Sequence, residues 1–121
     1  MAGGKLPRGE LESLVMEVLW DSADPLTPGD VRARLEPDRS LAYTTVMTIL
    51  TRLRDKGLVE REQVGRAFAY RPCQSREDRV AQRMGELLAA SSDRSVALSR
   101  FVAALPPEQV DELRRLLEED E

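Results

Sequence analysis

The chain has 121 residues, 41% hydrophobic and 33% charged, with a formal net charge of −4. This length allows one small domain with an added oligomerisation segment, and no apolar run approaches the roughly 20 residues of a membrane span. The sequence has no histidine, no glycine-rich phosphate loop, and one cysteine, Cys73. These absences exclude histidine-dependent catalysis, histidine metal ligation and an internal disulfide, so we expect no enzyme, cofactor or metal. The amino terminus lacks the apolar stretch of a secretory signal, which predicts a cytoplasmic protein without stable membrane association.

The acidic total hides an uneven distribution of charge. Residues 1–72 carry eleven basic and eleven acidic side chains, so the whole negative excess lies in residues 73–121. Between Arg39 and Arg71, seven basic residues stand against three acidic ones. Because salt screens charges more than about 10 Å apart, a nucleic acid would respond to this local field and not to the total charge.

The first two helices are predicted from apolar spacing and capping residues. The first spans about residues 8–21, with Leu11, Leu14, Val15, Val18 and Leu19 at helical spacing. Thr27-Pro28-Gly29-Asp30 opens the second, because threonine is a favoured N-cap and proline suits the first helical position. Val31 and Leu35 are predicted to face the core, and Glu36-Pro37-Asp38 to end this helix.

The third helix, predicted over about Tyr43–Lys56, has two different faces. Its apolar stripe is made of Val46, Ile49, Leu50 and Leu53. At 100° per residue, the opposite face is centred on Thr44, Thr48, Thr51 and Asp55, with Met47 and Arg52 on its flanks. Threonine costs a few tenths of a kcal/mol at an exposed helical site, so three on one face indicate a contact function. Gly57 is predicted to end the helix with a positive φ.

Two strands are predicted after this helix, Leu58–Gln63 and Ala67–Arg71, around the turn Val64-Gly65-Arg66. Phe68 and Tyr70 share one strand face and are predicted to form the core of the hairpin. Three helices followed by a hairpin are the order of a winged helix-turn-helix domain, which lays its third helix in the DNA major groove.

This arrangement assigns roles to individual side chains. Thr44 and Thr48 would offer hydroxyls and methyls to base edges, and Met47 would make apolar contact with thymine. Arg52 is placed for a phosphate or a guanine, and Arg66 at the hairpin tip for the backbone or the adjacent minor groove. Thr51 and Asp55 are interpreted as exposed helix surface without a contact.

Residues 73–121 are predicted to form short amphipathic helices. The first begins at the capping-box-like Ser75–Asp78, the second covers Ser95–Leu105, and the last follows Pro106-Pro107. These 49 residues are too few to bury their apolar stripes well, so we expect a two-fold dimer; folding back on the N-terminal domain is the alternative. The candidate dimerisation residues are Val80, Met84, Leu87, Leu88, Leu98, Phe101, Val102, Leu113, Leu116 and Leu117.

The expected fold class is therefore mostly α with a small β-hairpin. Residues 1–72 would form a winged helix-turn-helix DNA-binding domain and residues 73–121 a helical dimerisation domain. Such a dimer would read an inverted repeat of half-sites about 34–36 Å apart, or a multiple of that distance.

The same segments resemble the penicillinase repressor family of BlaI/MecI-type transcriptional repressors. The most specific part is the string AYTTVMTILTRL at 42–53, followed by KGL at 56–58. The resemblance also includes Leu11-Glu12, Val18-Leu19-Trp20, Gly65-Arg66, Phe68 and Tyr70-Arg71-Pro72, and extends through the C-terminal helices. With this string, the candidate DNA-binding residues are Thr44, Thr45, Met47, Thr48, Arg52 and Arg66.

The resemblance implies a homodimeric repressor with an interleaved C-terminal helical domain and short inverted-repeat operators near β-lactamase or related promoters, hence a link to antibiotic resistance. In the best-known members, a membrane sensor-protease releases repression by cutting before a phenylalanine, which maps onto Arg100–Phe101. Those members have asparagine where this chain has Arg100. A copper-responsive branch carries a C-terminal cysteine cluster, which a chain with Cys73 alone lacks.

The negative net charge leaves an alternative open. The chain could be a helical module that binds a protein partner and uses the winged fold as a scaffold without specific DNA binding. Enrichment of particular genomic DNA fragments would distinguish the two hypotheses.

Overall fold

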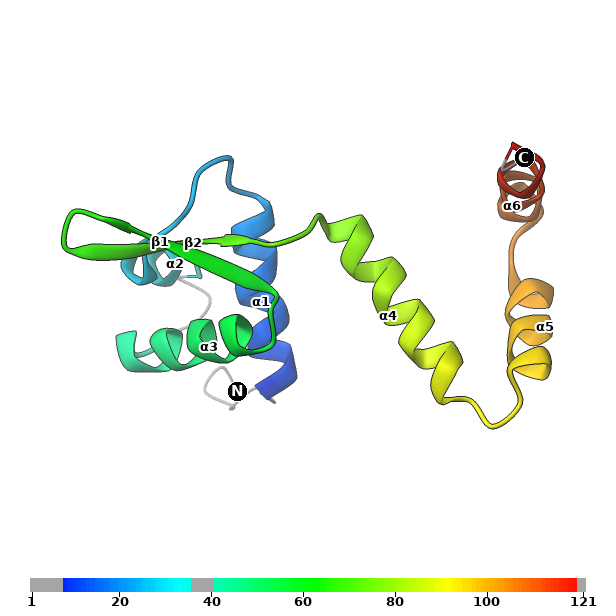
Figure 1. Cartoon of the computed structure of the whole chain (residues 1–121), viewed down its shortest axis with the longest axis horizontal. Coiled ribbons are helices and arrows are strands. Elements are labelled where there is room, and N and C mark those ends of the chain that lie inside the picture. The colour runs from blue at the N-terminus through cyan, green and yellow to red at the C-terminus, as the bar shows by residue number, and fades with distance from the viewer. Residues whose placement is uncertain (1–7, 36–40, 120–121) are drawn as a thin grey trace, which may run out of the picture. The chain divides into compact units, whose positions relative to one another are not determined.

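The computed structural model describes residues 8–35 and 41–119, in which the chain divides into two compact units that meet between Asp78 and Arg79. The first unit contains α1 (Arg8–Trp20), α2 (Pro28–Leu35), α3 (Tyr43–Asp55), β1 (Val59–Val64) and β2 (Ala67–Pro72). After it come α4 (Arg76–Ala90), whose first turn belongs to the first unit, α5 (Arg94–Ala104) and α6 (Pro107–Glu119) (Figure 1). This order confirms the predicted fold class. Across the described ranges, no helix combines the length and apolarity needed to cross a membrane.

A reciprocal capping box starts α2. The Asp30 backbone N–H donates to Thr27 Oγ1 at 3.1 Å, and the Thr27 N–H donates to Asp30 Oδ2 at 3.1 Å. Two backbone donors that the helix itself leaves unpaired are thereby satisfied, which confirms the predicted start at Thr27. The predicted stop at 36–38 lies outside the described residues. Beyond that gap, Arg32 Nε donates to the Leu41 carbonyl at 2.9 Å and ties α2 to the segment before α3.

The core of the first unit lies where α1, α2 and α3 meet the base of the hairpin. The apolar stripe predicted for α3 is its buried face: Val46, Ile49, Leu50 and Leu53 are each at most 1% exposed. They pack in one cluster with Val15 and Leu19 of α1 and Val31 of α2. Each fully buried aliphatic side chain of this kind contributes about 1.5–3 kcal/mol, so the core holds α3 firmly in place.

The hairpin is joined to the helical core at its base. β1 and β2 pair antiparallel from Val59↔Pro72 to Val64↔Ala67. Leu26 and Tyr70 exchange both backbone hydrogen bonds, at 2.9 and 2.7 Å, so the loop between α1 and α2 forms a bridge to β2. The tip extends beyond the helices (Figure 1). The predicted strands are confirmed to within one residue at each end.

Two glycines make the turns around β1. Gly57, directly after the C-cap of α3, has φ 76°, and Gly65 at the hairpin tip has φ 63°. L-residues with side chains rarely adopt this left-handed conformation, so both positions favour glycine. The positive φ predicted for Gly57 is confirmed.

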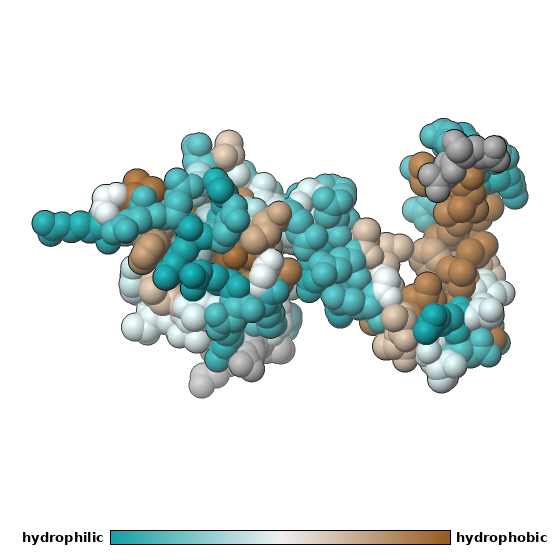
Figure 2. All heavy atoms as spheres, in the orientation of Figure 1, coloured by the Kyte–Doolittle hydropathy of each residue, from teal (hydrophilic) through white to brown (hydrophobic). Residues whose placement is uncertain are grey.

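The C-terminal helices form a unit with little interior. Among the described residues 79–119 none is buried. Asp93 caps α5 by accepting the Val96 N–H at 3.1 Å, so this helix starts one residue before the predicted Ser95. In the space-filling view, apolar side chains gather along α5 and α6 (Figure 2). The helices thus form as predicted, while their apolar faces stay exposed.

Candidate nucleic-acid interface

The exposed side of α3 carries the candidate base-reading residues. Thr44 and Thr48 are exposed, while Thr45, Met47 and Arg52 are half-buried with part of each side chain at the surface. Thr44 and Thr48 lie opposite the core stripe, and the other three lie on the flanks between the two faces, where partial burial is expected. The major groove, about 12 Å wide, admits an α-helix in this presentation.

Thr48 has a defined hydroxyl orientation. Its Oγ1 donates to the Thr44 backbone carbonyl one turn earlier, at 2.9 Å. The hydroxyl proton is therefore directed along the helix, and the methyl group and the remaining oxygen lone pairs are left for a binding partner. This presentation suits a thymine methyl or a base donor such as the amino group of adenine or cytosine.

The amino end of α3 has no side-chain cap. The N-cap residue is Ala42, with φ −71° and ψ 150°, and among the described residues no side chain accepts a hydrogen bond from the first-turn amides. Serine, threonine or aspartate at an N-cap would satisfy one of these amides. The uncapped amides and the helix dipole instead leave a partial positive charge at the amino end of α3, a feature that favours binding of an anion such as phosphate.

Arg71 lies on one face of the hairpin, where it forms ion pairs with two glutamates. Its Nε donates to Glu60 at 2.7 Å and its Nη1 to Glu62 at 3.2 Å. The hydrogen bond and charge of Glu60 raise the pKa of Arg71, so the guanidinium stays charged. Arg71 therefore offsets one of the two negative charges of Glu60 and Glu62, and the three side chains together keep a formal charge of −1.

The other face of the hairpin carries a cation that the sequence reasoning missed. The Arg61 guanidinium lies 3.9 Å from the centroid of the Phe68 ring. The prediction for the hairpin core is half right: Tyr70 is 1% exposed, but Phe68 is 38% exposed. Phe68 pairs with Gln63 towards the tip, whereas Tyr70 lies at the base beside Leu26. In the observed register Arg61 lies opposite Tyr70, which makes it a diagonal cross-strand neighbour of Phe68. The sequence pattern predicts no register for the two strands and therefore gives no signal of this contact.

The predicted basic field separates into paired and unpaired cations. Lys56 binds Glu12 of α1 at 2.6 Å, and Arg71 is held by Glu60 and Glu62. Arg39 lies outside the described residues. Within the described part of the chain, no carboxylate pairs with the remaining four, Arg52, Arg54, Arg61 and Arg66. Of the predicted basic field, these four are the side chains whose charge no carboxylate among the described residues offsets.

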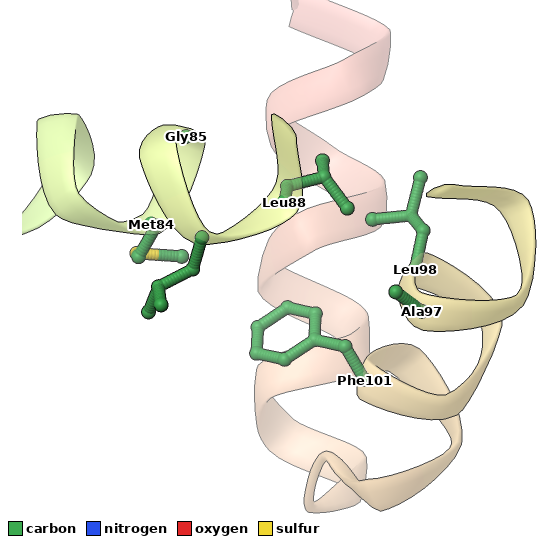
Figure 3. Close-up of a pocket in the computed structure, with 7 residues that line it drawn as sticks. Met84, Gly85, Leu88, Ala97, Leu98 and Phe101 are labelled. Atoms are coloured by element: carbon green, nitrogen blue, oxygen red, sulfur yellow. The ribbon is translucent and has the colours of Figure 1, made fainter. Parts of the chain in front are cut away.

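The candidate dimerisation residues lie on α4, α5 and α6. An apolar hollow of about 370 Å³ between α4 and α5 is lined by five of them, Met84, Leu87, Leu88, Leu98 and Phe101. The Phe101 ring and Leu98 of α5 face Leu88 and Met84 of α4 (Figure 3). On α6, Leu116 and Leu117 are exposed and Leu113 is half-buried. Val80 and Val102 are exposed on α4 and α5. The bond between Arg100 and Phe101 lies within α5.

Comparison with known proteins agrees with this architecture. A family profile described as "Penicillinase repressor" matches residues 8–119. The chain belongs to the penicillinase repressor family. It is 43% identical over 119 residues to proteins named "Transcriptional regulator BlaI" from two strains of Mycobacterium tuberculosis, CDC 1551 / Oshkosh and H37Rv, covering 95% of this chain and 86% of theirs. It is accordingly a winged-helix transcriptional regulator of the BlaI type, and not an enzyme.

Solved structures are similar at the level of the fold. The complex structure of hsRosR-S4 aligns with a TM-score of 0.53 and 19% identity, over 93% of this chain and 95% of that one. The complex structure of hsRosR-S1 aligns with a TM-score of 0.52 and 20% identity, over 85% and 92%. At these identities the alignments concern the fold alone.

Proposed function

We propose that this penicillinase repressor family member is a cytoplasmic homodimer that represses transcription by binding an inverted-repeat operator. The observation that carries the proposal is the exposed face of α3, a row of threonines with Met47 and Arg52. The same unit carries Arg61 and Arg66 on the hairpin, with which no carboxylate pairs in the described part of the chain. The buried face of α3 is fully packed, so the exposed side chains are presented from a rigid base.

Reading of base edges is assigned to α3. Thr44, Thr45, Met47 and Thr48 lie in its first half, where a recognition helix enters the major groove. Short hydroxyl and methyl side chains distinguish base pairs by their donors, acceptors and thymine methyls. Arg52, one turn further on, is assigned to a phosphate or a guanine.

Binding of the DNA backbone is assigned to the hairpin. Arg66 stands at the tip beside Gly65, and Arg61 lies over the Phe68 ring. A guanidinium on an aromatic face keeps its charge and several free N–H donors. Each cation placed on a phosphate releases a counterion, so these contacts would carry affinity and salt dependence, while α3 carries sequence preference.

Dimerisation is assigned to α4, α5 and α6. The described residues 79–119 bury no side chain, although their helices carry continuous apolar stripes. The hollow between α4 and α5 is lined by Met84, Leu88, Leu98 and Phe101 and has room for apolar side chains of a second copy. Exposed apolar patches of this kind mark association surfaces, and a second copy supplies a complementary stripe by symmetry.

The same proposal includes release by a membrane sensor-protease that cuts Arg100–Phe101. The bond lies within α5, which follows α4 and precedes α6 in the sequence. A cut there, after local unfolding of the helix, would detach α6 and the end of α5 and weaken the dimer. Mass spectrometry of the protein from cells exposed to a β-lactam would detect fragments that end at Arg100 and begin at Phe101.

The binding proposal is tested by fragment selection. The full chain is mixed with sheared genomic DNA on filters at low and moderate salt, and the retained fragments are sequenced. We expect a few fragments that share an inverted repeat to remain bound at moderate salt. Retention without enrichment of any fragment would overturn specific repression and favour a scaffold for protein partners.

A further inference from the structure

The segment that joins the hairpin to α4 is bonded at successive residues. The Cys73 N–H donates to the Leu58 carbonyl at 2.9 Å, and the Gln74 carbonyl accepts the Trp20 indole N–H at 2.9 Å. Ser75 Oγ then caps α4 by accepting the backbone N–H three residues later, at 3.0 Å. Each residue from 73 to 75 is thus held in place before α4 begins.

Arg76 continues this series in the first turn of α4. Its Nε and Nη2 donate to the two carboxylate oxygens of Glu17, at 3.3 and 2.6 Å, and Nη2 also reaches Asp21 at 3.2 Å. The guanidinium lies 5.3 Å from the centroid of the Trp20 ring. We call Glu17, Trp20, Asp21, Gln74 and Arg76 the junction latch.

The latch is suited to orientation more than to stability. The side chains of Arg76, Glu17 and Asp21 are 39, 52 and 71% exposed, and ion pairs this exposed add little to folding stability. A bidentate arginine–carboxylate contact nevertheless restrains the orientation of the first turn of α4 relative to α1, because both hydrogen bonds are lost when the guanidinium plane turns. The carboxylates and Trp20 belong to α1, whose Val15 and Leu19 lie in the core.

We propose that the junction latch lets the dimer select operators by the spacing between half-sites, with Arg76 as the positioning residue. This inference rests on the proposed function. α4 is one continuous helix of 15 residues, so a restraint on its first turn acts along its length. Each added base pair moves a half-site by about 3.4 Å and turns it by about 35° around the duplex axis, since one turn holds roughly 10–10.5 base pairs. If the latch restrains the junction, the winged units cannot follow this displacement of the half-site and affinity falls. If the junction were a free hinge, the winged units could reorient and affinity would be kept.

The test uses the full chain and an operator obtained by fragment selection, with its central spacer shortened or lengthened by one, two and five base pairs. For the unaltered protein we expect a loss of at least tenfold in affinity on changing one base pair. Arg76→Gln should reduce that penalty by at least threefold, because the winged units can then reorient. Arg76→Lys, which keeps the charge but lacks the fork, should lie between the two.

Arg83→Gln is the matched control. Arg83 lies on the same helix, its ion pair with Glu86 is confined to α4 at 3.1 Å, and the substitution changes the charge equally. Its spacing profile should equal that of the unaltered protein. Trp20→Phe keeps an aromatic ring but loses the N–H that donates to the Gln74 carbonyl. Like Arg76→Gln, it should reduce the loss of affinity caused by a changed spacer.

The outcomes separate this inference from the proposed function. Specific binding by the unaltered protein supports the proposed function whatever the spacing profile. Two results would overturn the latch. In one, Arg76→Gln loses as much affinity as the unaltered protein on each change of spacer length. In the other, the unaltered protein binds all spacer lengths with equal affinity. Circular dichroism confirms folding, and if Arg76→Gln is unfolded, the Trp20→Phe and Arg76→Lys profiles decide the question.

Discussion

Thr48 is expected to contribute to affinity for the operator but little to affinity for random DNA. Because its hydroxyl proton is directed to the Thr44 carbonyl, its methyl and lone pairs remain for the base edges. Thr48→Ala should cost about 1–3 kcal/mol of binding free energy on the selected operator and little on random DNA. Fluorescence anisotropy on both duplexes measures the difference.

Thr51 provides the matched control on the same helix. It is also an exposed threonine of α3, further from the amino end, and we interpret it as surface without a DNA contact. Thr51→Ala should leave both affinities nearly unchanged. A loss for Thr48→Ala that is equal on operator and random DNA would contradict direct reading of bases by this residue.

Arg61 is expected to act through charge. Arg61→Gln should weaken binding to operator and random DNA alike and lower the slope of log affinity against log salt by about one unit per chain. Phe68→Leu should weaken binding less and preserve the slope, since the cation remains but loses the ring beneath it. Arg83→Gln removes the same charge from α4 and should leave the slope unchanged. If Arg61→Gln had the same affinity and the same salt slope as the unaltered protein, Arg61 would not contact DNA.

At the scale of the element, the uncapped start of α3 is a place where stability and function compete. Ala42→Ser supplies an acceptor for a first-turn amide and should raise the free energy of unfolding by about 0.5–1 kcal/mol. Ala42→Asp should stabilise the helix as well, through the dipole, yet weaken DNA binding because a carboxylate would face phosphate. Thermal melts and binding titrations of the two variants measure both effects.

The comparison between these two variants decides the role of this helix end. Ala42→Ser changes capping without adding charge, so its DNA affinity should stay close to that of the unaltered protein. If Ala42→Asp bound the operator as tightly as Ala42→Ser, the amino end of α3 would lie away from the phosphates.

The elements themselves were largely predictable from local pattern. The stripe of Val46, Ile49, Leu50 and Leu53 follows the helical period, Thr27 and Asp30 form a capping box, and Gly57 ends α3 with a positive φ. Each of these features depends on residues within a few positions of one another, so a short window of sequence contains the whole cause.

The contacts between elements were not predictable in the same way. Trp20 binds Gln74 across 54 residues and Arg76 binds Glu17 across 59. Arg71, counted with the basic field, is held by Glu60 and Glu62, and Phe68 lies too near the hairpin tip to be covered by the core. Such pairings depend on which helix face meets which strand, and only the packed fold specifies that.

At the scale of the whole molecule, dimerisation is the prediction that the C-terminal helices support. Leu117→Glu places a charge on a stripe residue that is 69% exposed in the single chain, so the fold of one chain should tolerate it. In a dimer, each copy would lose the burial of one leucine, roughly 1.5–3 kcal/mol. The dissociation constant measured by sedimentation should rise about a hundredfold or more.

Arg115→Gln is the control for this experiment. It changes the net charge by the same amount from the other side of α6, since two residues correspond to a turn of about 200°. Its dissociation constant should match that of the unaltered protein. A Leu117→Glu chain that remained as firmly dimeric would place the dimer interface elsewhere.

The exposed stripes of α4 and α6 also bear on how long a chain survives in the cell. A copy without a partner displays Leu87, Leu116 and Leu117, each more than half exposed, and such apolar surface attracts chaperones and proteases. Under the proposed dimerisation, dilution would therefore lower occupancy of the operator and shorten the lifetime of the protein together. When the synthesis rate of the protein falls, repression would then decrease more steeply than DNA affinity alone dictates. A brief pause in synthesis would be enough to remove the protein from the operator.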